Sequence, residues 1–183
     1  MFARFRRARL DPAIPSTLYG VIVAQARTPG LYTDLGVPDT VEGRFEMVVA
    51  HLALVLRRLE RGDEAAREAG QAVFDVFSRE MDDALRALGV KDTSVGKRMR
   101  SLTGAYYGRA SAYEAALEAN DAVALAAALG RTVYGGEGEM AAPALAAYML
   151  AVDEVLAAMP AGRVVAGDIA WPGIHAQPAE TKP

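Results

Sequence analysis

The sequence predicts an all-α protein, a single bundle of about six helices. Apolar residues recur at steps of three and four along most of the chain, which is the spacing of one buried helix face. No segment alternates apolar and polar residues over a useful strand length. At 183 residues the chain has the length of one domain, and its 52% apolar content favours a packed core over disorder.

Three helices are predicted in the first half of the chain, each bounded by residues that start or stop helices. Side chains that cap helix N-termini are Ser16, then Asp39 or Thr40, then Asp63, and Gly62 and Gly89 are natural stops. Pro29 and Gly30 are expected to end the first helix, and a loop with further glycine and proline follows. The expected ranges are about 16–27, 39–62 and 63–89.

Three more helices are predicted in the second half. A glycine-rich tract at 135–138 separates the last two of them. This tract is interpreted as a turn, because it lacks the preceding strand and the basic residue of a phosphate-binding loop. The expected ranges are about 92–120, 121–130 and 141–159.

The two ends of the chain differ in composition from the bundle. We expect a basic flexible arm at 1–14, an all-α domain at 15–175 and a flexible tail at 176–183. The arm either stays disordered or dips its aromatic rings into an anionic membrane surface. The side chains that would contact a membrane are Phe2, Arg4, Phe5, Arg6, Arg7 and Arg9.

Composition and motifs exclude several kinds of chemistry. The chain has no cysteine and two histidines, which removes disulfides, thiolate sites and a multi-histidine metal site. It has neither a Gly-x-Ser-x-Gly elbow nor a phosphate-binding loop ending in Lys-Ser or Lys-Thr. The formal charge of −3 argues against a basic nucleic-acid coat. We therefore expect no metal, no cofactor, no catalytic residue and no DNA partner, in a cytoplasmic protein.

Charged side chains gather on both sides of the turn expected near residue 90. Acidic residues lie near the C-terminus of one helix and basic residues near the N-terminus of the next. Both placements are unfavourable, because each puts a charge beside the end of the helix dipole that has the same sign. Either the two sets pair across the turn, or the basic set is an exposed patch for an anionic partner. The sets are Glu80, Asp82 and Asp83 against Lys97, Arg98 and Arg100.

Gly104 and Gly108 share a face of the fifth predicted helix, where each costs about 1 kcal/mol relative to alanine. We expect them to allow close approach of another helix. Larger side chains surround that face. Either they pack in the core, or they form an aromatic groove edged by arginine, and such residues are common in binding hot spots. The larger side chains are Tyr106, Tyr107, Arg109 and Tyr113.

His51 lies in the middle of a strongly apolar stretch. It is either a hydrogen-bonded histidine of the core or its boundary, or a polar anchor in a groove for a partner. An alternative function follows from this residue. The chain would then be a small-ligand-binding or enzymatic bundle whose apolar cavity is lined by His51, Asp82 and Asp83.

Two groups of segments resemble the ubiquinol–cytochrome c chaperone family, which has mitochondrial and alphaproteobacterial members. The resemblance covers about residues 16–160. The first group is Leu31-Tyr32, Gly36-Val37-Pro38-Asp39-Thr40, Glu42-Gly43-Arg44-Phe45-Glu46-Met47, His51-Leu52 and Leu54-Val55-Leu56-Arg57-Arg58-Leu59. The second is Met81-Asp82, Leu85-Arg86, Gly89-Val90, Asp92, Val95, Lys97, Met99 and Tyr106-Tyr107-Gly108-Arg109, with Tyr113 beyond it.

The resemblance implies a non-enzymatic chaperone that binds newly made cytochrome b and supports assembly of ubiquinol–cytochrome c reductase, respiratory complex III. It also implies a small partner protein and the ribosome as further partners. Cytochrome b spans the membrane, so a peripheral site on the inner face of the cytoplasmic membrane is expected. The predicted partner surface is Arg44, His51, Lys97, Arg98, Arg100, Tyr107, Arg109 and Tyr113.

Overall fold

The computed structural model describes residues 11–136 and 141–174, and in these ranges the chain forms helices and no strands. The predicted all-α class is therefore confirmed. The helices are α1 Ala13–Ala26, α2 Pro29–Thr33, α3 Val41–Glu60, α4 Glu64–Ala87, α5 Asp92–Glu118, α6 Ala122–Thr132, α7 Ala142–Ala158 and α8 Ala161–Val165.

Thr40, Asp63 and Asp121 begin helices as the sequence indicates, whereas Ser16 lies inside α1, whose N-cap is Pro12. The Thr40 hydroxyl accepts from the backbone N–H of Gly43 at 3.0 Å and starts α3. The carboxylates of Asp63 and Asp121 accept backbone N–H groups in the first turns of α4 and α6. Each cap satisfies a donor that the helix itself leaves unpaired.

Two short helices lie outside the six predicted ranges, α2 in the loop after the first helix and α8 beyond the last. Pro29 was expected to end α1, but it occupies the first turn of α2 instead. Its fixed φ suits that place, and its missing N–H costs nothing there. Proline likewise precedes α8, where Pro160 is the N-cap.

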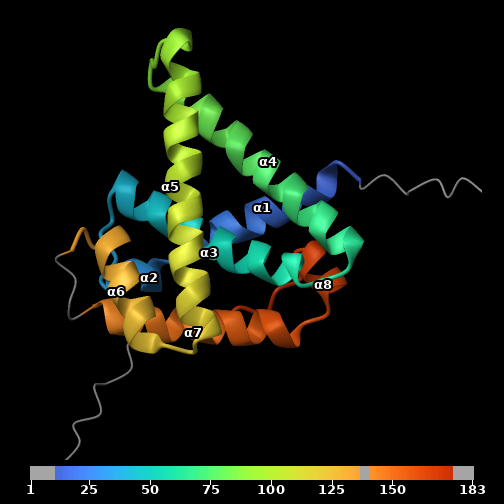
Figure 1. Cartoon of the computed structure of the whole chain (residues 1–183), viewed down its shortest axis with the longest axis vertical. Helices are drawn as coiled ribbons and strands as arrows, with labels where there is room; N and C mark the ends of the chain where they lie inside the picture. The colour runs from blue at the N-terminus through green and yellow to red at the C-terminus, as the bar shows by residue number, and fades with distance from the viewer. Residues whose placement is uncertain (1–10, 137–140, 175–183) are drawn as a thin grey trace, which may run out of the picture.

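Helix α3 forms the centre of the fold and contacts α1, α4, α5, α7 and α8. Every residue from 46 to 55 is buried, so this part of α3 is covered on all sides. Figure 1 shows α5 crossing in front of α3, with α6 and α7 near its lower end. These contacts hold α5 over the centre of the molecule.

Helices α4 and α5 are joined by the turn at 88–91 and meet at the top of Figure 1, away from the other helices. This tip is largely exposed, and Leu88 keeps 79% of its surface in solvent. In the described ranges, no helix is both long enough and apolar enough to cross a membrane.

Candidate functional site

An open groove lies between α3, α4 and α5. Its volume is about 330 Å³, and apolar side chains line most of it, with charged side chains at the edges. Helix α3 contributes Ala53, Leu54, Leu56, Arg57 and Glu60. The other lining residues are Arg67, Gly70, Gln71 and Phe74 from α4, and Tyr106, Tyr107, Ala110, Ser111, Tyr113, Glu114 and Leu117 from α5.

Three aromatic rings form one wall of the groove. The Phe74 ring lies 5.0 Å from that of Tyr106 and 5.8 Å from that of Tyr107, between ring centroids. Tilted pairs at such distances are favourable because ring edges meet ring faces. Tyr106 is buried, whereas Tyr107 is 59% exposed, so the wall runs from the core to the surface.

Gly70 fixes the floor of the groove. A Cβ at this position would lie 3.3 Å from the Cβ of Leu59 and 3.6 Å from a methyl of Leu56. The absence of a side chain therefore lets α4 approach α3 closely.

Arg57 places a nearly buried cation at the groove. Its Nη1 donates to both carboxylate oxygens of Asp153 on α7, at 2.8 and 3.1 Å. Its Nε is buried and has no hydrogen-bond partner among the described residues. An unpaired buried donor costs about 1–3 kcal/mol.

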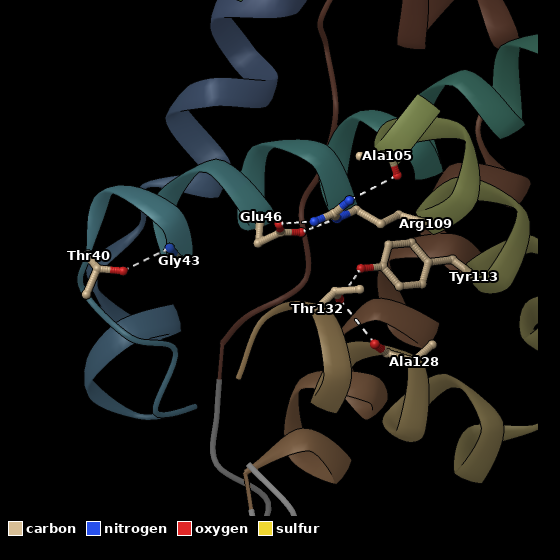
Figure 2. Close-up of polar contacts among 8 residues, drawn as sticks. All are labelled: Thr40, Gly43, Glu46, Ala105, Arg109, Tyr113, Ala128 and Thr132. Carbon is tan, nitrogen blue, oxygen red and sulfur yellow. Dashed lines mark hydrogen bonds and ion pairs between the residues drawn. The ribbon is translucent and has the colours of Figure 1, made fainter. Parts of the chain in front are cut away.

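A bidentate ion pair holds α5 on α3 (Figure 2). Arg109 donates from Nε and Nη2 to the two carboxylate oxygens of Glu46, each at 2.6 Å, and from Nη1 to the carbonyl of Ala105 at 3.0 Å. The hydrogen bond to Glu46 raises the pKa of Arg109. Glu46 is buried, so the pair acts mainly to fix the position of α5.

Tyr113 fixes the same helix to α6 (Figure 2). The Thr132 hydroxyl donates to the carbonyl of Ala128 at 3.1 Å and therefore accepts from the Tyr113 hydroxyl at 2.7 Å. Burial raises the pKa of Tyr113 to about 12, which keeps this donor protonated. Tyr113 is 2% exposed but still lines the groove, so its part in a partner surface stays a prediction.

His51 is also inside the protein, with no exposed surface, and its place on the predicted partner surface is wrong. Burial lowers its pKa to about 4, so the ring is neutral at pH 7. The Met47 carbonyl can only accept, so Nδ1 carries the proton and donates to it at 2.8 Å. Nε2 then accepts from the Tyr148 hydroxyl at 3.0 Å, which in turn accepts from Gln25.

The basic side chains at the start of α5 are exposed and make no ion pair with any described residue. The predicted pairing across the turn therefore does not form between Lys97, Arg98 or Arg100 and the acidic set. Asp82 pairs instead with Arg86, one turn further along α4, at 2.6 Å. Of the two explanations, the structure favours the exposed patch.

The other predicted residues lie apart from the groove. Arg44 is exposed and its Nε contacts the carboxylate of Asp39 at 2.5 Å. The arm residues Phe2, Arg4, Phe5, Arg6, Arg7 and Arg9 lie outside the described residues. In the described part of the chain, no three His, Asp or Glu side chains are placed to hold a metal ion.

The alternative cavity lined by His51 and Asp82 is not present at these residues. Asp82 and Asp83 line a shallow hollow with Ser78, Arg79 and Met99 near the tip of α4 and α5. The ring of His51 contacts α7 and the edge of Trp171, and lines neither this hollow nor the groove.

Most groove residues were not predicted, among them Phe74 and Arg57. Phe74 falls on the apolar side of its helix, which gives no sign that this ring is partly exposed. Arg57 lies in a run that looks like an ordinary polar edge of a helix. Their place in the groove depends on how α4 and α7 pack on α3. That packing involves residues far apart in the chain, so the pattern of a short segment does not predict it.

Comparison with known proteins identifies the family. Residues 33–171 match the family described as ubiquinol-cytochrome C chaperone, and the chain belongs to that family. The family predicted from the sequence is thus confirmed. The comparison with curated proteins gave no match.

A solved structure supports the same assignment. The chain is similar to the Cbp3 homolog from Brucella abortus, whose crystal structure superposes with a TM-score of 0.81. The two sequences are 41% identical, and the match covers 88% of this chain and 90% of the other. The helical bundle is therefore the fold that the two proteins share.

Proposed function

We propose that the chain is an assembly chaperone of respiratory complex III that binds newly made cytochrome b in the groove between α3, α4 and α5. Membership of the ubiquinol-cytochrome C chaperone family is the observation that carries the functional part of this proposal. The same membership favours a binding protein over an enzyme.

The chemistry of the groove supports its role as the client site. A segment of a membrane protein offers apolar side chains, and an open apolar groove can take one face of such a segment out of water. Tyr107 adds a large exposed ring, and tyrosine is enriched where binding energy is concentrated.

Site-specific photocrosslinking tests the proposal. A photoreactive amino acid replaces Tyr107 in the groove and, in a matched control, Val123, which is 80% exposed on α6 and outside the groove. We expect a crosslink to cytochrome b from position 107 and none from 123. Both variants must restore the complex III spectrum of a strain that lacks the protein.

Two results would overturn the proposal. If complex III accumulates normally without the protein, its role as an assembly chaperone is wrong. If position 107 gives no crosslink in a variant that restores assembly, or gives no more than position 123, the groove is not the client site.

A further inference from the structure

One exposed face of α5 includes Tyr107, Ser111 and Glu114, which also line the groove. A second molecule bound on this face would therefore exclude the client proposed above. The residues of this face recur at steps of three and four, which places them along one side of the helix. Figure 1 shows α5 in front of α3 with no helix drawn in front of it. The face consists of Lys97, Arg100, Gly104, Tyr107, Ser111, Glu114 and Glu118, all of them exposed.

The charges on this face are separated along the helix. Lys97 and Arg100 lie in the first half, and Glu114 and Glu118 in the second half. Glu118 contacts Arg61 at 2.8 Å, but both side chains of that pair are about half exposed. Lys97, Arg100 and Glu114 make no ion pair with a described residue.

The middle of the face has room for another helix. A Cβ added at Gly104 or Gly108 would meet nothing within 4 Å, so the close helix approach expected there does not occur within the described chain. Tyr107 stands beside these two positions with 59% of its surface exposed.

We propose that this face binds the same face of a second copy, with the two α5 helices antiparallel. Arg100 and Glu114 each lie seven residues from Tyr107, so an end-for-end rotation about Tyr107 brings Arg100 of one copy opposite Glu114 of the other. Lys97 and Glu118 lie ten and eleven residues from Tyr107 and come opposite each other in the same way. One two-fold axis therefore pairs all four charges, as an isologous interface requires.

The steric pattern fits the same arrangement. At the axis, Tyr107 of one copy lies beside Tyr107 of the other, and Gly104 and Gly108 next to it leave space for the two rings. Antiparallel helices also place the negative end of one helix dipole beside the positive end of the other. A second copy is favoured over an unrelated partner because the face already carries the complement of its own charge pattern.

The expected dimer is weak and sensitive to salt. The stretch from 97 to 118 is about 33 Å long at the rise of an α-helix, and one helix pair buries an area near the low end of specific interfaces. Exposed ion pairs are screened by added salt. Sedimentation of the full chain at low and high salt should show dimers that dissociate as the salt concentration rises.

Charge exchange tests the register of the interface. Arg100→Glu and Glu114→Arg each place like charges opposite one another, and we expect each to raise the dissociation constant of the dimer about tenfold or more. An equimolar mixture of the two variants should dimerise again, and so should the double variant Arg100→Glu with Glu114→Arg. Arg98→Glu is the matched control, since Arg98 lies nine residues from Tyr107 and so on the opposite side of the helix.

The proposal is wrong if the unaltered chain stays monomeric at low salt over the accessible concentration range. It is also wrong if the mixture and the double variant stay monomeric while circular dichroism shows them folded. An equal loss of dimer in Arg98→Glu would likewise overturn it, because the effect would then come from net charge and not from this face.

Discussion

We expect Gly43→Ala to destabilise the protein, because the backbone of Pro38 leaves no room for a side chain at position 43 in the first turn of α3. An added Cβ would overlap the carbonyl oxygen of Pro38 and lie 3.1 Å from its carbonyl carbon. Both are backbone atoms, so no flexible side chain can move aside. The loop before α3 and the first turn of the helix would have to separate.

Two effects of Gly43→Ala lower the free energy of unfolding, and one raises it. Forcing an extra methyl into a closed backbone contact costs about 1–3 kcal/mol. The same shift strains the hydrogen bond from the Gly43 N–H to Thr40, a cap worth about 1 kcal/mol. Alanine returns about 1 kcal/mol through its higher helix propensity. The free energy of unfolding should therefore fall by about 1–3 kcal/mol.

Gly20→Ala is the matched control, because a Cβ at Gly20 in α1 would meet nothing within 4 Å. We expect this variant to keep or gain up to about 1 kcal/mol of stability. Urea unfolding followed by circular dichroism measures both. A loss of about 2 kcal/mol in Gly43→Ala corresponds to a fall in Tm of about 4–8 °C for a domain of this size. Equal stability of the two variants would refute the argument from the Pro38 contact.

Two further changes test the polar contacts inside the fold. His51 has a folded pKa of about 4 against 6.5 when unfolded, so the unfolded chain binds its proton first as the pH falls. Stability should therefore drop by about 1.4 kcal/mol per pH unit between those values, and urea titrations should show a shallower drop in His51→Gln. Arg109→Ala leaves the buried carboxylate of Glu46 unpaired and should lower the free energy of unfolding by about 2 kcal/mol. Arg131→Ala, the control, removes an exposed arginine and should lower it by less than about 0.5 kcal/mol. If His51→Gln keeps the same dependence of stability on pH, the assignment of His51 is wrong. If thermal unfolding shows equal losses of stability for Arg109→Ala and Arg131→Ala, the role of the Glu46 ion pair is wrong.

Much of the fold could be predicted because it depends on local signals. Thr40, Asp63 and Asp121 cap the helices that they were expected to begin, and glycines follow the ends of α3 and α4. Pro29 shows the limit of such signals, since a proline can end one helix or start another. Only the packing of the flanking segments decides between the two.

The site was harder to predict because it depends on contacts between distant residues. Both Tyr107 and Tyr113 line the groove, but the sequence did not show that Tyr107 is exposed and Tyr113 buried. Both tyrosines lie on one helix, and their exposure differs because α6 covers one side of α5 and leaves the other open. The burial of His51 depends in the same way on α7 and Trp171.

The segments that resemble the chaperone family hold α3 and α5 in place, and Tyr106, Tyr107 and Tyr113 among them line the groove. Gly43 allows the loop to close on α3, and Glu46 binds Arg109 to hold α5 in place. Tyr107, in the same segment as Arg109, instead keeps an exposed ring in the groove wall. A functional loss in Arg109→Ala should therefore come with a loss of stability. A functional loss in Tyr107→Ala should come with little change in Tm, and this difference separates the residues that shape the groove from those that contact the client.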